Sequence, residues 1–150
     1  MKIAIATDHR GVDYKKTLIS LLEKNFEVID ASPENMPTDD YPDFAFKVGS
    51  LVATKTADFG VLICGTGIGM SIAANKVKGI RCALVTSLET AMLAKNHNDA
   101  NVLAFSSTMD PELAARCVVE YSETKVNEDE KHARRVQKIV DYENGQYNEL

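Results

Sequence analysis

The sequence predicts an α/β protein in which a parallel β-sheet is covered by helices on both faces. Short apolar runs rich in β-branched residues alternate along the chain with longer segments whose apolar residues recur at helical spacing. Strands that alternate with helices in this way form parallel sheets, because each helix returns the chain to the edge where the next strand starts. Both faces of such a sheet are buried.

The first third of the chain contains two expected strands and two expected helices. Residues 2–7 form an apolar run that is typical of a buried strand, and residues 13–25 carry an apolar face at helical spacing. Residues 26–30 predict a second strand. The three prolines and several acids of residues 31–42 predict a loop, which leads into an amphipathic helix at 43–53.

A strand, a glycine-rich turn and a helix occupy the centre of the chain, in DFGVLICGTGIGMSIAANK (residues 58–76). The strand at 59–63 ends at Cys64, the sequence Gly-Thr-Gly-Ile-Gly follows, and a helix is expected at 70–76. Glycines let the backbone approach a ligand closely, and the first amides of a helix are free to bind an anion. The same field favours the thiolate form of Cys64. The motif predicts a nucleophile or base beside an anion-binding turn.

Two other interpretations of this motif were weighed. Its G-x-G-x-G spacing is neither the dinucleotide fingerprint nor the phosphate loop that ends in Lys-Ser/Thr, and it follows the third expected strand rather than the first. These features argue against nicotinamide binding and nucleotide hydrolysis. Cys64 by itself also fits a buried thiol that acts as a small hydrophobic side chain.

The last third of the chain continues the alternation. Residues 81–86 predict a strand, 88–95 a helix and 102–105 a further strand. Pro111 suits the first turn of the helix that follows. The charged segment 128–145 predicts a final helix, and because its apolar stripe is too narrow for a core helix, we expect it to pack on a partner subunit.

Composition and charge limit the class of protein. With 150 residues, 45% of them hydrophobic, the chain is expected to form a single domain over 1–150. A net charge of −5 without a long basic run argues against a nucleic-acid partner. No apolar run approaches membrane-spanning length, and the start of the chain lacks the apolar core of a secretion signal. The three widely spaced cysteines suit free thiols in a reducing cytoplasm and lack the spacing of a zinc site.

Polar or potentially reactive residues stand at the ends of three expected strands: after the first, after the third and before the fifth. Asp8 and His9 follow the first strand, and Cys64 follows the third, so all three are expected at the carboxyl edge of the sheet, where ligands bind in this class of fold. His97 and Asn98 precede the fifth strand, which places them at the opposite edge within one subunit. A second subunit could bring His97 to Cys64. The plainer interpretations are a helix C-cap for His97 and Asn98 and a capped turn for Asp8 and His9.

Together these motifs resemble the family of ribose-5-phosphate isomerase B and the galactose-6-phosphate isomerase subunits, over nearly the full length. The segments that carry the resemblance are IATDH (5–9), DYP (40–42), ICGTGIGMSIAANK (63–76), GIR (79–81), HNDANV (97–102) and HARRV (132–136). The resemblance implies a Rossmann-like three-layer sandwich, a homodimer or dimer of dimers with active sites shared between subunits, and aldose–ketose isomerisation of a sugar phosphate without metal or cofactor.

The resemblance also implies roles for individual residues. Cys64 would be the base that moves a proton through a cis-enediolate, while Asp8 and His97, the latter from the other subunit, would open the sugar ring. Thr66 and Asn98 would add hydrogen bonds to the enediolate oxygen. The substrate-binding residues would be His9, Tyr41, Gly65, Gly67, Ile68, Gly69, Met70, Lys131 and Arg135. Some relatives use a glutamate as base where this chain has Met70, so this chain is of the cysteine type.

The chain departs from the family pattern at its phosphate-binding arginines. Thr108 stands where an arginine usually follows the fifth strand, and Lys131 stands where a second arginine is usual. Lysine keeps the charge but loses bidentate hydrogen bonding. Arg10, where small residues are common in the family, is either an anion contact or a solvent-facing side chain. Three functions therefore remain open: ribose-5-phosphate isomerisation, the same chemistry on a hexose phosphate or a free aldose, and non-catalytic phosphate binding.

Overall fold

Five parallel strands form the centre of the structure, a computed structural model that describes residues 1–148. The strands lie in the order β2-β1-β3-β5-β4. They comprise β1 (Lys2–Thr7), β2 (Glu27–Asp30), β3 (Phe59–Cys64), β4 (Cys82–Leu84) and β5 (Val102–Ser106). The helices comprise α1 (Val12–Leu22), α2 (Tyr41–Ala53), α3 (Ile68–Ala74), α4 (Leu88–Asn98), α5 (Pro111–Glu123) and α6 (Glu130–Glu143).

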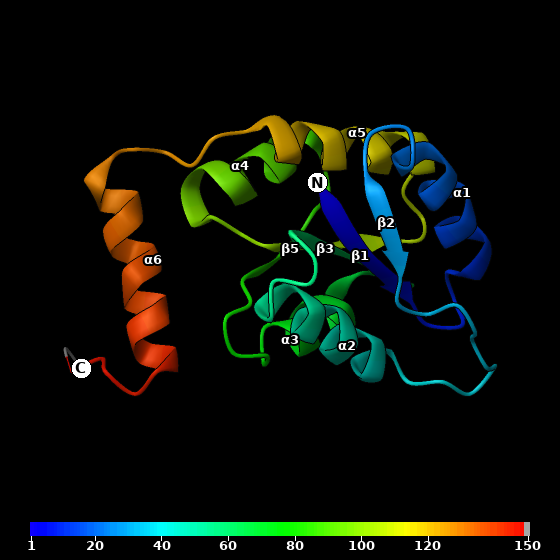
Figure 1. The fold of residues 1–150 in the computed structure, drawn as a ribbon, viewed down its shortest axis with the longest axis horizontal. Coiled ribbons are helices and arrows are strands. Elements are labelled where there is room, and N and C mark those ends of the chain that lie inside the picture. Colours follow the sequence, from blue (N-terminus) through cyan, green and yellow to red (C-terminus); the bar gives the residue numbers. More distant parts are fainter. Residues whose placement is uncertain (149–150) are drawn as a thin grey trace.

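Helices cover both faces of the sheet, as the sequence predicts. Figure 1 shows α1, α4 and α5 on one face and α2 and α3 on the other. Successive side chains of a strand point to opposite faces, so Ile3 and Ile5 pack towards α1 and α5, while Ala4 and Ala6 pack towards α2 and α3. The three-layer α/β sandwich is confirmed.

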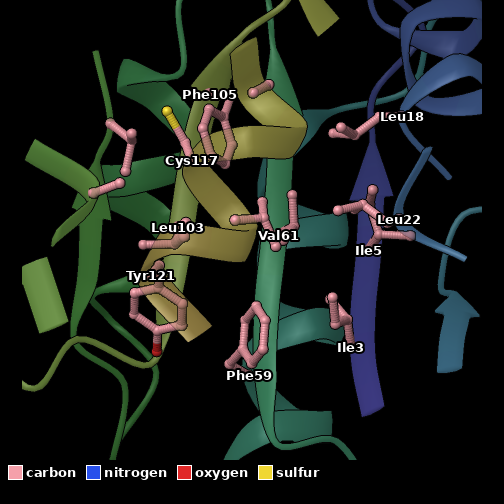
Figure 2. Close-up of a cluster of buried hydrophobic side chains, with 14 of the residues drawn as sticks. Ile3, Ile5, Leu18, Leu22, Phe59, Val61, Leu103, Phe105, Cys117 and Tyr121 are labelled. Atoms are coloured by element: carbon pink, nitrogen blue, oxygen red, sulfur yellow. The ribbon is translucent and has the colours of Figure 1, made fainter. Parts of the chain in front are cut away.

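Large side chains fill the layer between the sheet and α5. Figure 2 shows Phe59 of β3 beside Tyr121 of α5, and their ring centroids lie 4.9 Å apart. The Tyr121 hydroxyl donates to the carbonyl of Ala100, so this buried polar group is satisfied. The other face has smaller residues, Ala4 and Ala6 among them, which bring α2 and α3 close to the sheet.

The strand order creates a crevice at the carboxyl ends of β1 and β3. From β1 the chain moves outwards to β2 and then crosses back to β3 on the other side of β1, which makes this a topological switch point. Thr7 pairs with Ile63, so the segments that follow, beginning at Asp8 and Cys64, lie side by side. Ligands bind at such crevices in open α/β sheets.

Several element boundaries differ from the sequence-based expectations. Helix α2 begins at Tyr41 rather than at residue 43. The first amides of a helix have no partner within the helix, so the missing N–H of Pro42 costs no hydrogen bond in the first turn. Helix α4 continues past residue 95 to Asn98 and ends at Asp99, which adopts a left-handed conformation (φ 44°). Strand β4 is shorter than expected and spans Cys82–Leu84.

Helix α6 stands beside the rest of the molecule (Figure 1). It has no buried residue, and its apolar residues Ile139 and Tyr142 are 50% and 69% exposed. Its end is held where the Glu143 carboxylate accepts the backbone N–H of Gly79 at 2.9 Å. Packing of α6 on a partner subunit stays a prediction. None of the helices within residues 1–148 has the length and apolar character needed to cross a membrane.

Candidate active site

Cys64 ends β3 at the crevice, and its side chain is 5% exposed. The backbone N–H of Gly67 donates to its sulfur at 3.2 Å. Cys64 belongs to the buried cluster between the sheet and α2 and α3, but it also lines a cavity of about 140 Å³. The residues that line this cavity are Asp8, Arg10, Tyr41, Cys64, Gly65, Thr66 and Gly69. Cys64 is therefore a core residue that also borders a cavity with polar and charged neighbours.

The turn after Cys64 requires glycine at position 67. Gly67 has φ 78°, and a Cβ there would lie 2.9 Å from the carbonyl carbon of Phe105. The amides of Gly69 and Met70 lie in the first turn of α3, and none of the hydrogen bonds among residues 1–148 uses them. The turn therefore presents free donors beside the sulfur, as expected of an anion-binding turn.

The side chains around α3 differ in how they meet the cavity. The ring of Tyr41 lies directly over Gly69, where a Cβ would be 2.7 Å from its Cζ, and Tyr41 lines the cavity. The side chain of Met70 is fully buried in the core beneath α3, so only its backbone can meet a ligand. Ile68 points outwards and is 52% exposed. Thr66 lines the cavity and accepts the N–H of Ile68 at 3.2 Å.

Asp8 has both a structural and a cavity-lining role. Its side chain is buried, and Oδ1 accepts the backbone N–H of Arg10 at 3.0 Å, which closes the turn after β1. The first residue before α1 is Gly11, so Asp8 is not the N-cap of that helix. Asp8 also faces the same cavity as Cys64, where a carboxylate can exchange a proton with a ligand.

The buried side chain of Lys15 helps to fix the end of β1 through hydrogen bonds. The Lys15 ammonium, 3% exposed, donates to the Asp30 carboxylate at 2.9 Å and to the Ser32 hydroxyl at 3.1 Å. The Ser32 hydroxyl in turn accepts the backbone N–H of Thr7 at 3.0 Å. These contacts join α1, β2 and the following loop to the last residue of β1, and so fix where Asp8 begins.

His9 forms a carboxylate–imidazole pair with Asp39. Asp39 Oδ1 accepts the backbone N–H of His9 at 2.8 Å and its Nδ1–H at 2.9 Å. Asp39 Oδ2 accepts donors from Asn35 (2.8 Å) and from the backbone of Met36 (3.1 Å). The hydrogen bond that His9 donates to Asp39 raises the pKa of His9, and the nearby charge of Asp8 adds to the effect. These contacts hold the His9 ring in one orientation, favour its protonated form and leave Nε2 for another partner.

We expect Asp39→Asn to lower the pKa of His9, because the variant loses the charged acceptor that stabilises the imidazolium. Folding raises this pKa, so the pair contributes stability below the ordinary pKa of 6.5, and the contribution is lost as the pH rises through the folded value. An NMR titration of the His9 ring protons measures the shift. Asp13→Asn, which removes an exposed carboxylate of α1, is the control. An unchanged His9 titration in Asp39→Asn would contradict the pairing.

The other predicted site residues lie apart from this cavity. His97 and Asn98 end α4, just before β5 begins at Val102, which pairs with Gly60. Gly60 precedes Cys64 by four residues, or about 13 Å of strand. Within one chain His97 and Asn98 therefore belong to the opposite edge of the sheet, where the helix C-cap interpretation also places them.

The residues of α6 gather near that second group. The ring of His132 stacks on His97 with centroids 4.2 Å apart and planes 10° apart. Lys131 pairs with Asp129 at 3.3 Å and is 51% exposed, and Arg135 is also exposed. None of these residues lines the Cys64 cavity. The structure of one chain thus divides the predicted site into two groups.

Asp39 was missed by the sequence analysis, and Arg10 was left undecided. Asp39 stands in an acid-rich loop, 30 residues after His9, and no local pattern distinguishes it from its acidic neighbours. Arg10 is now seen at the cavity, with its guanidinium against Gly65. The contacts of both residues could not be read from a local pattern, because only the folded chain brings the loop and the two strand ends together.

These features define an α/β protein with a cysteine and unused backbone amides beside a cavity at a topological switch point. Comparison with known proteins gives its family: the profile of the ribose/galactose isomerase family matches residues 3–139. The chain belongs to this family and is an isomerase.

Relatives of known name cover almost the whole chain. The ribose-5-phosphate isomerase B of Escherichia coli is 40% identical over 140 residues, which are 93% of this chain and 94% of the relative. A probable ribose-5-phosphate isomerase B of Mycoplasma pneumoniae is 44% identical over 144 residues, 94% of each chain. The structure of ribose-5-phosphate isomerase B from Mycoplasma genitalium with bound ribulose-5-phosphate matches with a TM-score of 0.88 and 43% identity, over 95% of this chain and 96% of that one.

Proposed function

We propose that the chain interconverts ribose 5-phosphate and ribulose 5-phosphate through a cis-enediolate, with Cys64 as the base. The observation that carries this proposal is the cavity at the ends of β1 and β3, which Cys64 and Gly69 line together, beside the unused amides of the first turn of α3. The named relatives, one of them described with bound ribulose-5-phosphate, support the choice of substrate.

The reaction needs a base that moves one proton between adjacent carbons. The Cys64 thiolate takes the proton from C2 of the open-chain aldose, and the electron pair of that C–H bond forms the C1–C2 double bond of the enediolate. Within the enediolate the proton of the C2 hydroxyl passes to the C1 oxygen, and return of the carbon-bound proton to C1 then gives the ketose and restores the thiolate. The Gly67 N–H that bonds the sulfur stabilises the thiolate before the first transfer and after the second.

The negative charge of the intermediate lies on an oxygen beside the reacting carbons. The unused amides of Gly69 and Met70 are suited to hold it, since they are fixed donors that need no reorganisation. Thr66 adds a hydroxyl at the cavity wall, and Tyr41 closes the side above Gly69. Asp8 lines the same cavity, where it can take the proton of the anomeric hydroxyl when the furanose ring opens.

A second copy of the chain would complete the site. His97 is the proposed acid that protonates the ring oxygen, Asn98 a hydrogen-bond donor to the intermediate, and Lys131 and Arg135 are proposed phosphate contacts. All four lie away from the Cys64 cavity of their own chain, at the end of α4 and on the exposed helix α6. A homodimer that brings this group to the partner's cavity accounts for both the exposure of α6 and the division of the site.

Mixing two inactive variants tests the shared site. Cys64→Ala and His97→Gln should each be inactive, but a mixed dimer contains one site with both residues intact. After unfolding and refolding together in equal amounts, about one quarter of the wild-type activity is expected, because half of the dimers are mixed and each has one working site. Variants refolded separately and then combined on ice are the control. A mixture as inactive as its parents would contradict a site shared between subunits.

Isotope exchange and a substrate panel test the chemistry. Turnover in heavy water should place deuterium at C1 of ribulose 5-phosphate or at C2 of ribose 5-phosphate, whereas an internal hydride shift would place none. The panel compares ribose 5-phosphate with six-carbon phosphates and with free sugars. Because Thr108 and Lys131 replace the usual arginines, a clear preference for a free sugar or a hexose phosphate would overturn the assigned substrate but keep the isomerase.

A further inference from the structure

Arg10 directs its charge into the catalytic cavity. Its guanidinium lies against Gly65: a Cβ on that glycine would be 3.1 Å from Cζ and 3.2 Å from Nε and Nη1. Gly65 follows Cys64 directly, and Arg10 lines the cavity together with Cys64 and Asp8. The side chain is thus placed by the turn after β1 and by a glycine that leaves room for it.

The guanidinium has no partner in the part of the chain that the structure describes. The ion pairs and hydrogen bonds among residues 1–148 use only the backbone N–H of Arg10, which donates to Asp8 at 3.0 Å. An arginine presents a planar set of five donors that matches a phosphate group with two parallel hydrogen bonds. Arg10 is exposed and lines the cavity beside Cys64, so its unpaired guanidinium is available to an anionic ligand that enters there.

Gly65 lies between Arg10 and the end of β5. The Ser106 hydroxyl donates to the carbonyl of Gly65 at 2.8 Å and lies 2.6 Å from the Thr108 hydroxyl. Thr108 is uncharged and does not line the Cys64 cavity, whereas Arg10 lines it and is the one basic side chain among its lining residues.

We propose that Arg10 binds the phosphate group of the ligand that occupies the Cys64 cavity, and so makes the enzyme prefer phosphorylated over free sugars. This inference builds on the proposed function. The reacting carbons and the phosphate are opposite ends of a pentose phosphate. The Gly67 amide and the unused amides of Gly69 and Met70 already serve the reacting carbons, and the arginine fork matches a phosphate group, so the charge of Arg10 is assigned to the phosphate.

Kinetics of Arg10→Gln and Arg10→Lys test the assignment. In Arg10→Gln, KM for ribose 5-phosphate should rise roughly 10- to 100-fold with kcat nearly unchanged, since a charge-assisted hydrogen bond is lost from binding. Arg10→Lys should recover part of the affinity. The kcat/KM for free ribose should not change in either variant. Arg116→Gln, on α5 at the far face of the sheet, is the matched control and should behave as wild type.

A direct binding measurement separates this inference from the proposed function. Iodoacetamide should modify Cys64 preferentially, because burial raises the pKa of Cys82 to about 12 and also raises that of Cys117, which is fully buried. Inorganic phosphate should slow modification of Cys64 in the wild type but not in Arg10→Gln, with the site read by mass spectrometry. This readout requires no turnover, so it supports or rejects the phosphate contact even if the enzyme acts on another sugar.

Two results would overturn the assignment. Equal losses of kcat on phosphorylated and free sugars would place Arg10 at the reacting carbons rather than at the phosphate. Equal protection of Cys64 by phosphate in wild type and Arg10→Gln would show that other groups bind the anion. If the wild type turns over no sugar phosphate but its protection by phosphate depends on Arg10, the phosphate contact stands and the proposed function fails.

Discussion

Replacing Cys64 by alanine is expected to lower kcat for ribose 5-phosphate by about 10³-fold or more, because the proton transfer loses its base. The fold should survive, since the side chain is small and lies at the end of β3 beside a cavity rather than at the centre of the core. Affinity for a non-reacting sugar phosphate should change little. Steady-state kinetics measure the loss of kcat, and calorimetric titration with the non-reacting sugar phosphate measures the affinity.

The matched control is Cys82→Ala. Cys82 begins β4 outside the Cys64 cavity, and burial raises the pKa of its thiol to about 12, so its removal should leave kcat at the wild-type value. A Cys64→Ala enzyme that keeps most of its turnover would reject Cys64 as the base. In that case the chain would need a different proton acceptor, and Asp8 is the carboxylate that faces the same cavity.

The second large effect is expected at Gly67, where alanine should destabilise the fold by about 3 kcal/mol or more. Part of this cost is the left-handed backbone at φ 78°, and the rest is the approach of the new Cβ to the carbonyl carbon of Phe105, at 2.9 Å in the present geometry. Phe105 belongs to β5 and cannot move aside easily. Any shift of the turn also displaces the N–H that bonds the Cys64 sulfur, so activity should fall with stability.

Gly145→Ala separates the two causes. Gly145 also has a left-handed backbone, φ 70°, but nothing lies within 4 Å of its Cβ position. Its replacement should cost only about 1 kcal/mol. Urea unfolding of both variants and the wild type gives the difference. Similar losses at the two positions would show that the contact with Phe105 is unimportant.

The layer structure was predictable because it depends on local patterns. Apolar runs such as Lys2–Thr7 and the alternating amphipathic segments determine strands, helices and a buried parallel sheet whatever their order in space. The errors lie at the element ends, where single residues decide. Pro42, expected in a loop, sits in the first turn of α2, and the helix expected to end at residue 95 runs to Asn98.

The site was predictable only in part. Cys64 and the glycine turn are contiguous in sequence, and Asp8 follows the neighbouring strand, so parallel topology brings them together. Asp39 could not be found in this way, because its contact with His9 depends on the path of an irregular loop. The roles proposed for His97 depend on the packing of a second chain, which no pattern within one chain specifies.

The sequence by itself determined the α/β class and the position of Cys64 and the glycine turn beside it, since these follow from residues close together along the chain. Only the tertiary structure decided that Arg10 lines the same cavity as Cys64 with its charge unpaired, and that Asp39 binds His9 and raises its pKa. The reason is physical: hydrophobic periodicity is a local property, whereas the environment of a charge depends on which distant segments the fold places around it.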